Sequence, residues 1–239
     1  MGMDLTGQRV LVVGGSKYLG EAVARKAAKA GASVVVGARA LDQARAAAET
    51  LADATAIRID VTDEASIAAA AADLGSVDHV VITASAHHNV PVTDLDKSET
   101  LAAFDAKVIG PLLVAKHFAP RMPPTGSIVL FSGVAAWSPA PPFTVMGVTN
   151  GAVSFLATHL AHELAPIRVN AISPGIVDSG TWDALGDEAK KNLLADAAKS
   201  NLAGRAGTRE DIADAALWLL GAGFVSGETI HVEGGARYA

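Results

Sequence analysis

Short runs of apolar, β-branched residues alternate with alanine-rich stretches along almost the whole chain. The runs predicted as strands span residues 9–13, 33–37, 55–60, 78–83, 127–132, 167–173 and 229–234. The stretches predicted as helices span residues 19–31, 41–52, 63–74, 96–118, 145–164 and 209–220. Because the strands are apolar without alternation, both of their faces should be buried, which is typical of a parallel sheet between helices. The pattern predicts a doubly wound α/β domain with about seven strands.

The composition limits the classes of protein to which the chain can belong. With 239 residues, half of them hydrophobic, the chain can bury the core of one domain. The net charge of −6 argues against a nucleic acid or an anionic membrane as partner. The chain has no cysteine and starts without the apolar core of a signal peptide, so we predict a cytoplasmic protein without a metal site. Prolines interrupt the uncharged stretch 122–158, which excludes a continuous membrane-spanning helix there.

A glycine-rich loop joins the first predicted strand to the first predicted helix, in the run VLVVGGSKYLGEAVA. Gly14, Gly15 and Gly20 allow a tight turn and a close approach of backbone to a ligand. The free amides at the start of the following helix would then face a pyrophosphate. Glycines also serve simply as turns, but a loop at this place in an alternating chain favours dinucleotide binding.

The end of the second predicted strand indicates which dinucleotide binds. Strands that select NAD end near an acid that hydrogen-bonds the ribose hydroxyl. Here the run VVVGARA has no acid and contains Arg39. A guanidinium offers planar, paired donors to a 2′-phosphate, and Lys17 could add a second positive charge. We therefore predict NADP(H) in preference to NAD(H), the alternative being that both cations are solvated at the surface.

From about residue 8 to 235, the chain resembles the short-chain dehydrogenase/reductase family. The glycine loop is similar to the family's T-G-x-x-x-G-x-G motif, with Val13 for the threonine and Tyr18 for the middle glycine. VDHVVITASA is similar to D-x-x-V-x-N-A-G, IRVNAISPG to the strand and turn beside the nicotinamide, and GRAGTREDIADAALWLLGAGFVSGETIHVEGG to the C-terminal segment. The resemblance implies a single-domain Rossmann fold over residues 1–239, with a substrate lid at about 176–203.

Transferred position by position, the resemblance implies a set of cofactor-binding residues. Asp60 falls where the family places an acid–hydrophobe pair against the adenine, although it could instead be the N-cap of the helix that starts near residue 63. The predicted set is Gly14, Ser16, Lys17, Tyr18, Leu19, Gly20, Arg39, Asp60, Val61, Thr83, Ala84, Ser85, Asn150, Pro174, Gly175 and Ile176.

All four catalytic positions of the family are changed. In the family a tyrosine exchanges the proton, a lysine four residues later lowers the pKa of that tyrosine and holds the nicotinamide ribose, a serine orients the carbonyl, and an asparagine supports a relay water. Without gaps, SIVLFSGVAAWSPAPPFTVMGVTNG puts Gly133 at the serine, Met146 at the tyrosine and Asn150 at the lysine. Gly110 matches the glycine of the family's N-x-x-G turn, which puts Lys107 at the asparagine. A thioether has no exchangeable proton, so Met146 cannot be the acid.

Lysine and asparagine have thus exchanged places. We hypothesise that Lys107 supplies the missing positive charge near the nicotinamide ribose while Asn150 hydrogen-bonds the ribose hydroxyls, the alternative being an ordinary exposed lysine. His87 follows the fourth strand at the carboxyl edge and could exchange protons near neutral pH, or could be a plain loop residue. Lys107 could itself act as the acid if burial lowered its pKa. Ser132 is expected to point away from the site because strand residues alternate.

The scarce aromatic side chains gather in the segments expected around a substrate. Each of them could equally pack in the core or in an interface. The predicted pocket residues are His88, Trp137, Phe143, Met146 and Trp182. The helix at 145–164 is apolar nearly all round, which favours burial against a partner subunit. The resemblance implies a homodimer or homotetramer built on the helices at 96–118 and 145–164.

Three functions remain open at this point. The first is an NADP(H)-dependent oxidoreductase for a carbonyl or alcohol of a small molecule, with a site that lacks the tyrosine–lysine pair. Hydride chemistry resides in the cofactor, so the protein needs to bind, orient and polarise. The second is a catalytically silent protein that binds NADP(H) or supports an assembly, and the third is a non-redox enzyme that reuses the pocket. We favour the first.

Overall fold

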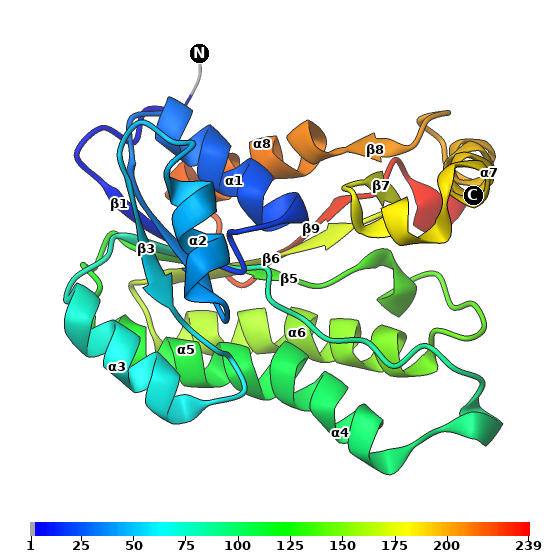
Figure 1. Ribbon diagram of the computed structural model, residues 1–239, viewed down its shortest axis with the longest axis horizontal. Helices are drawn as coiled ribbons and strands as arrows, with labels where there is room; N and C mark the ends of the chain where they lie inside the picture. The colour runs from blue at the N-terminus through cyan, green and yellow to red at the C-terminus, as the bar shows by residue number, and fades with distance from the viewer. Residues whose placement is uncertain (1–2) are drawn as a thin grey trace.

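The chain folds around one sheet of seven parallel strands, in the order β3-β2-β1-β4-β5-β6-β9 (Figure 1). The computed structural model describes residues 3–239. The strands are β1 (Arg9–Val13), β2 (Ser33–Ala38), β3 (Ala54–Arg58), β4 (His79–Ile82), β5 (Ser127–Phe131), β6 (Arg168–Pro174) and β9 (Thr229–Val232). The predicted doubly wound α/β fold is confirmed.

Helices cover both faces of this sheet (Figure 1). On one face lie α1 (Tyr18–Lys29), α2 (Leu41–Ala48) and α8 (Arg209–Gly221). On the other lie α3 (Glu64–Leu74), α4 (Lys97–Phe104), α5 (Gly110–Phe118) and α6 (Thr144–Glu163). Each face packs its own apolar cluster against the sheet, so burial of two cores drives the three-layer arrangement.

Strand β1 shows why the strands are apolar throughout. Val10 and Val12 pack toward α1 and α8, whereas Leu11 and Val13 pack toward the opposite layer. All four side chains are at most 1% exposed, because neighbouring strands and helices enclose the strand on every side. No position of β1 between Val10 and Val13 therefore tolerates a polar residue.

The order of the strands reverses beside β1. The chain first runs outward from β1 to β3, then returns to β4 on the other side of β1 and continues outward to β9. Connections after β1 and β4 thus leave toward opposite faces of the sheet. Ligands of open parallel sheets bind in the crevice at such a point, outside the carboxyl ends of the strands.

The helix predicted at 96–118 has three parts. A π-helical turn (Asp105–Ile109) separates α4 from α5. Pro111 stands in the first turn of α5 and lacks the amide that a regular helix would use there. One extra residue per turn rotates the side chains before Gly110, and such turns occur frequently at functional sites.

The segment at 176–203, predicted as a substrate lid and left without a helix, contains a regular helix. It comprises β7 (Val177–Asp178), a helical turn (Thr181–Leu185) and α7 (Asp187–Lys199), and β7 pairs with β8 (Gly207–Thr208). Acidic residues in the first turn of α7 and Lys199 in its last suit the helix dipole. The sequence prediction assigned no helix to this segment and was wrong there.

The helices described between residues 3 and 239 include none with the length and apolarity needed to cross a membrane.

Candidate functional site

The glycine loop lies tightly against the ends of its neighbouring strands. The amides of Gly14 and Gly15 both donate to the carbonyl of Gly37, at 2.8 and 3.1 Å. Gly14 has φ +87°, and a Cβ there would lie 2.6 Å from Oγ1 of Thr83 and 2.9 Å from the amide of Ala84. A residue with a side chain therefore does not fit at position 14, where the loop passes the end of β4.

The start of α1 is open toward this loop. Lys17 is its N-cap, and no side chain accepts a hydrogen bond from the first-turn amides. Tyr18, at the family's middle glycine, keeps a left-handed conformation with φ +53°, uncommon for a residue with a side chain. A Cβ on Gly20 would collide with the carbonyl oxygen of Gly14. The loop thus retains the tight turn and the free amides that suit a phosphate.

Two cations lie exposed at this edge. Lys17 precedes α1, and Arg39 follows β2, whose last residues pair with the end of β1. Neither side chain forms a hydrogen bond or a salt bridge among residues 3–239. Both are free to meet an anionic group.

Asp60 lies in the turn between β3 and α3 and is not the cap of that helix. Its Oδ1 accepts from the amide and the hydroxyl of Thr62, at 3.1 and 2.8 Å. The N-cap is Asp63, which accepts from the amide of Ala65 at 3.1 Å. The alternative role considered for Asp60 was wrong, and contact with the adenine stays a prediction.

The turn after β4 orients two histidines differently. Nε2 of His88 accepts the amide of Asp96 at 3.1 Å, which turns this ring toward the start of α4. His87 is exposed, and its Nε2 lies 3.4 Å from Oγ of Ser85. Desolvation, followed by the positive charge of Lys107, lowers the pKa of His87. His87 therefore lies within the field of the buried lysine while it still reaches solvent.

Lys107 is buried, not an ordinary exposed lysine. The π-helical turn directs it toward the carboxyl end of β5, where Nζ donates to the carbonyl of Ser132 at 3.4 Å. The residue is 6% exposed, and burial lowers the pKa of Lys107 to about 8. Among residues 3–239 this is its single hydrogen bond, although an ammonium has three donors.

Asn150 occupies the space that a side chain at position 133 would need. A Cβ on Gly133 would lie 2.6 Å from Nδ2 of Asn150, and its three nearest atoms all belong to the Asn150 side chain. Oδ1 of Asn150 is buried and has no hydrogen-bond partner among residues 3–239. Asn150 from α6 and Lys107 from the π-helical turn thus converge on the Ser132–Gly133 peptide.

The hydroxyl of Ser132 faces α6. It donates to the carbonyl of Asn150 at 2.8 Å and accepts from the hydroxyl of Ser154 at 3.0 Å. These bonds fasten the end of β5 to the helix that carries Asn150.

The predicted pocket residues come from three segments: one after β4, one between β5 and the first turn of α6, and one after β7. Phe143 precedes α6 and Met146 lies in its first turn, and both are partly buried. Trp137 lies between β5 and α6, half-exposed. Nε1 of Trp182 donates to the carbonyl of Val177 at 2.9 Å, within residues 176–203, the predicted lid. A shared substrate wall stays a prediction.

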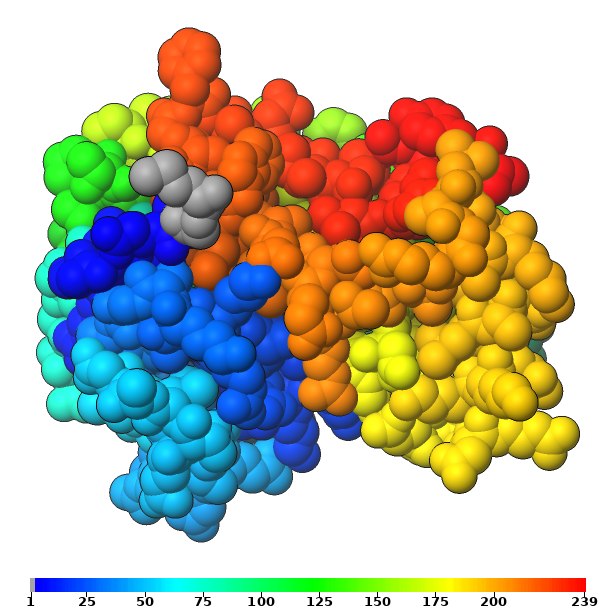
Figure 2. Space-filling view, turned by 90° about the horizontal axis from the view of Figure 1, so that it is seen from above, coloured from blue at the N-terminus to red at the C-terminus, as the bar shows by residue number. Residues whose placement is uncertain are grey.

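Sequence reasoning missed Arg209, the first residue of α8. A Cβ on Gly180 of the lid would lie 2.6 Å from Nη2 of Arg209 and 3.2 Å from Cδ1 of Tyr18, so three segments meet there. Figure 2 shows the start of α8, in orange, between the blue N-terminal part and the yellow lid. Among residues 3–239 Arg209 forms no salt bridge. The sequence signal that could have identified Arg209 is a cation in the first turn of a predicted helix, where the helix dipole disfavours a positive charge.

Sequence reasoning also missed a polar cluster at the end of β9. The rings of Trp137 and His231 meet edge to face, with centroids 5.0 Å apart. The buried carboxylate of Glu233 lies 3.6 Å from Nδ1 of His231 and 3.4 Å from Nε of Arg237. Desolvation is the main cause that lowers the pKa of His231, the charge of Arg237 adds to it, and Glu233 opposes it.

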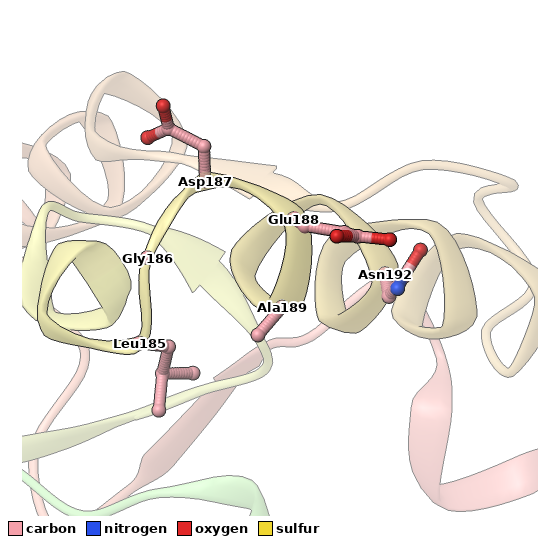
Figure 3. Close-up of a pocket in the computed structure, with 6 residues that line it drawn as sticks. All are labelled: Leu185, Gly186, Asp187, Glu188, Ala189 and Asn192. Carbon is pink, nitrogen blue, oxygen red and sulfur yellow. The ribbon is translucent and has the colours of Figure 1, made fainter.

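A shallow hollow lies on the lid, where α7 begins (Figure 3). Its lining residues are all exposed: Leu185, Gly186, Asp187, Glu188, Ala189 and Asn192. It lies away from the glycine loop and from Lys107, so we assign it no part in the site.

The chain is similar to known proteins over almost its whole length. Residues 14–237 match the sequence model of a family described as enoyl-(acyl carrier protein) reductase. Short-chain dehydrogenase/reductase ucsE of an Acremonium species is 33% identical over 251 residues, which cover 96% of this chain and 95% of that protein. The glycine loop and the surroundings of Lys107 and Asn150 therefore both lie within the matched region.

Solved structures are similar over the same length. A short chain dehydrogenase/reductase family protein has a TM-score of 0.89 and 31% identity, covering 99% of this chain and 100% of its own. A small-chain dehydrogenase in complex with NADPH has a TM-score of 0.83 and 27% identity, covering 97% of this chain and 99% of its own.

Proposed function

The chain belongs to the short-chain dehydrogenase/reductase family, and we propose that it is an NADP(H)-dependent oxidoreductase that interconverts a carbonyl and an alcohol of a small molecule. The observation that carries this proposal is the cradle formed by the glycine loop and the open start of α1. A fluorescence titration with NADPH tests it, followed by NADPH oxidation across a panel of carbonyl compounds. Absence of NADPH binding would refute the proposal.

The described residues fit a dinucleotide. The amides at the start of α1 would face its diphosphate, and we add Arg209, which approaches Gly180 as Tyr18 of this loop does, as a further phosphate ligand. When bound, the dinucleotide supplies or accepts a hydride, and the protein binds and orients it. Arg39 and Lys17 favour a cofactor with a 2′-phosphate.

Arg39→Asp should reverse the cofactor preference. It removes a bidentate cation and places a carboxylate where NAD(H) presents ribose hydroxyls. Charge-assisted hydrogen bonds contribute about 1.5–3 kcal/mol, so the affinity for NADPH should fall roughly 10–150-fold while that for NADH rises. Fluorescence titration with both cofactors measures the change.

The matched control is Arg121→Asp, which alters an exposed arginine in the turn after α5. It should leave both affinities unchanged. If Arg39→Asp weakens NADPH no more than Arg121→Asp does, Arg39 is a solvated surface residue.

Lys107 and Asn150 then take over the tasks of the missing lysine. The ammonium of Lys107 places a positive charge beside the nicotinamide ribose, which its approach to the Ser132–Gly133 peptide supports. Buried acceptors need donors, and a ribose hydroxyl would satisfy Oδ1 of Asn150. This division of roles extends the lysine–asparagine exchange read from the sequence.

A catalytically silent protein that binds NADP(H) is the second candidate. Gly133 and Met146 favour it, because neither can orient a carbonyl or move a proton. Tight NADPH binding without turnover of any carbonyl or alcohol in a broad panel would favour this candidate over the oxidoreductase.

We further propose that the protein is cytoplasmic and forms a homodimer or homotetramer through the α4–α5 region and α6. Large apolar side chains stand exposed on these helices, although water disfavours such patches. They are Leu101, Ile109, Leu112, Val148 and Phe155.

Phe155→Glu should dissociate this assembly. Phe155 is 70% exposed on α6, and a charge buried there without a partner would oppose association. Size-exclusion chromatography with light scattering should show a smaller species. Leu185→Glu, which changes an exposed apolar residue of the lid, should keep the wild-type mass. A monomeric wild-type protein would contradict the proposal.

A further inference from the structure

We propose that the ammonium of Lys107 is the proton donor of this site and that His87 returns the proton from solvent, an inference that rests on the proposed oxidoreductase function. It assigns the task that Met146 cannot perform to a residue of another helix.

The position of Lys107 supports its role as the proton donor. Its Nζ lies 3.4 Å from the carbonyl of Ser132, the residue directly before Gly133. Position 133 is where the resemblance places the serine that orients a substrate carbonyl. Because Gly133 has no side chain, the ammonium is the donor at this end of β5, and one of its three N–H groups serves Ser132.

Other protic groups are engaged elsewhere. The chain has two tyrosines: Tyr18 lies on the glycine loop, and Tyr238 is 71% exposed beneath the guanidinium of Arg237. The hydroxyl of Ser132 donates to the carbonyl of Asn150 at 2.8 Å. Nε2 of His88 accepts the amide of Asp96. None of these groups is placed to serve a carbonyl beside Gly133, whereas Nζ of Lys107 lies at that end of β5.

The surroundings of Lys107 suit a group that gains and loses a proton near neutral pH. Burial lowers its pKa to about 8, and no carboxylate counteracts that shift. Desolvation and then the charge of Lys107 lower the pKa of His87. Asp105 lies on the same turn and is partly exposed, and the titratable groups of α6 lie in its last turns: His159, His162 and Glu163.

His87 supplies the route to solvent. Lys107 is 6% exposed and cannot exchange freely with water. His87 is exposed and follows β4, the strand that pairs with β5, at whose end Nζ of Lys107 lies. An imidazole passes a proton between its two nitrogens. His87 acts through Lys107 and is therefore a positioning residue.

In reduction, the carbonyl carbon accepts a hydride, and the former π-electron pair becomes localised on the carbonyl oxygen. That oxygen takes a proton from Nζ of Lys107, which leaves a neutral amine and an alcohol. Lys107 then regains a proton from water through His87. Alcohol oxidation reverses each transfer, with neutral Lys107 as the base.

The first experiment follows the Lys107 side chain directly by NMR of isotope-labelled lysine in the protein saturated with NADP⁺. One signal should titrate near pH 8, following the lowered pKa, and should be absent from Lys107→Arg. A Lys107 signal that titrates near the ordinary value of 10.5 would overturn the proposal.

The second experiment measures NADPH oxidation with phenanthrenequinone as the carbonyl probe. Lys107→Arg keeps the positive charge but cannot release a proton, so kcat should fall roughly 10²–10⁴-fold. Protonated Lys107 persists below its pKa, so wild-type reduction should decline as pH rises through about 8, and Lys107→Arg should lose this inflection. An unchanged pH profile in Lys107→Arg contradicts the inference.

His87→Asn separates the relay from a structural role. It should slow hydrogen exchange of the Lys107 ammonium, and added imidazole should restore the rate; slow exchange without rescue would remove His87 from the proposal. Loss of NADPH binding by the wild type would refute the proposed function itself. Retained binding with a Lys107 that does not titrate near pH 8 would refute this inference alone.

Discussion

Gly20→Ala is expected to weaken NADPH binding roughly 100-fold without unfolding the protein. Gly20 is buried in the first turn of α1, and an added Cβ would collide with the carbonyl oxygen of Gly14 and lie 2.6 Å from Oγ1 of Thr83. The carbonyl oxygen of Gly14 belongs to the backbone, so it cannot rotate away as a side chain would. The glycine loop must shift, and its amides would then no longer face the diphosphate. Fluorescence titration gives the affinity, and circular dichroism tests the fold.

Gly151→Ala is the matched control. Gly151 also lies inside a helix, α6, but nothing lies within 4 Å of the Cβ that alanine would add. Alanine in a helix interior is favoured over glycine by roughly 0.5–1 kcal/mol, so this variant should be at least as stable as the wild type and bind NADPH normally. Equal affinities in the two variants would show that the glycine loop does not hold the cofactor.

Gly133→Ala is expected to lower the melting temperature by several degrees, and loss of the Asn150 side chain should relieve much of that effect. The backbone of Gly133 is extended, so the added methyl strains no dihedral angle. It would instead lie 2.6 Å from Nδ2 of Asn150. Overpacking costs about 1–3 kcal/mol, and each kcal/mol shifts the melting temperature by about 2–4 °C in a chain of this size.

A double-mutant cycle isolates this contact. Gly133→Ala combined with Asn150→Ala should be more stable than the sum of the single changes predicts, by about 0.5–3 kcal/mol. Gly133→Ala combined with Thr149→Ala should be additive, because Thr149 bonds within its own helix, to the carbonyl of Val145. Additivity in both pairs would mean that the loss of serine at position 133 is unrelated to the asparagine at position 150.

Much of the fold follows from patterns with a local cause. The strand predicted at 9–13 is β1, residue for residue. Its apolar, largely β-branched run begins after the charged Arg9 and ends before Gly14 and Gly15, which fixes both of its ends. Gly31 follows the end of α1 with φ +89°, as expected for a glycine that closes a helix. The helix α7 escaped prediction because its polar residues give a weak apolar face and little tertiary packing.

The site was predictable where it depends on spacing. Lys107 and Gly110 are three positions apart, and Gly133 and Met146 are thirteen positions apart, so alignment alone predicted which positions are changed. The meeting of Arg209, Gly180 and Tyr18 was not predictable, because it joins segments far apart in the sequence.

The sequence by itself determined the parallel α/β architecture and the glycine loop, and it predicted a site without the tyrosine–lysine pair, because periodicity, chain turns and side-chain chemistry are local properties. The tertiary structure alone decided where Lys107 and Asn150 lie relative to Gly133. Burial of Lys107 and the fit of Asn150 against Gly133 depend on how two helices pack on the end of β5. A lysine in solvent keeps its proton near neutral pH, whereas a desolvated one releases it more readily, and no residue pattern encodes that desolvation.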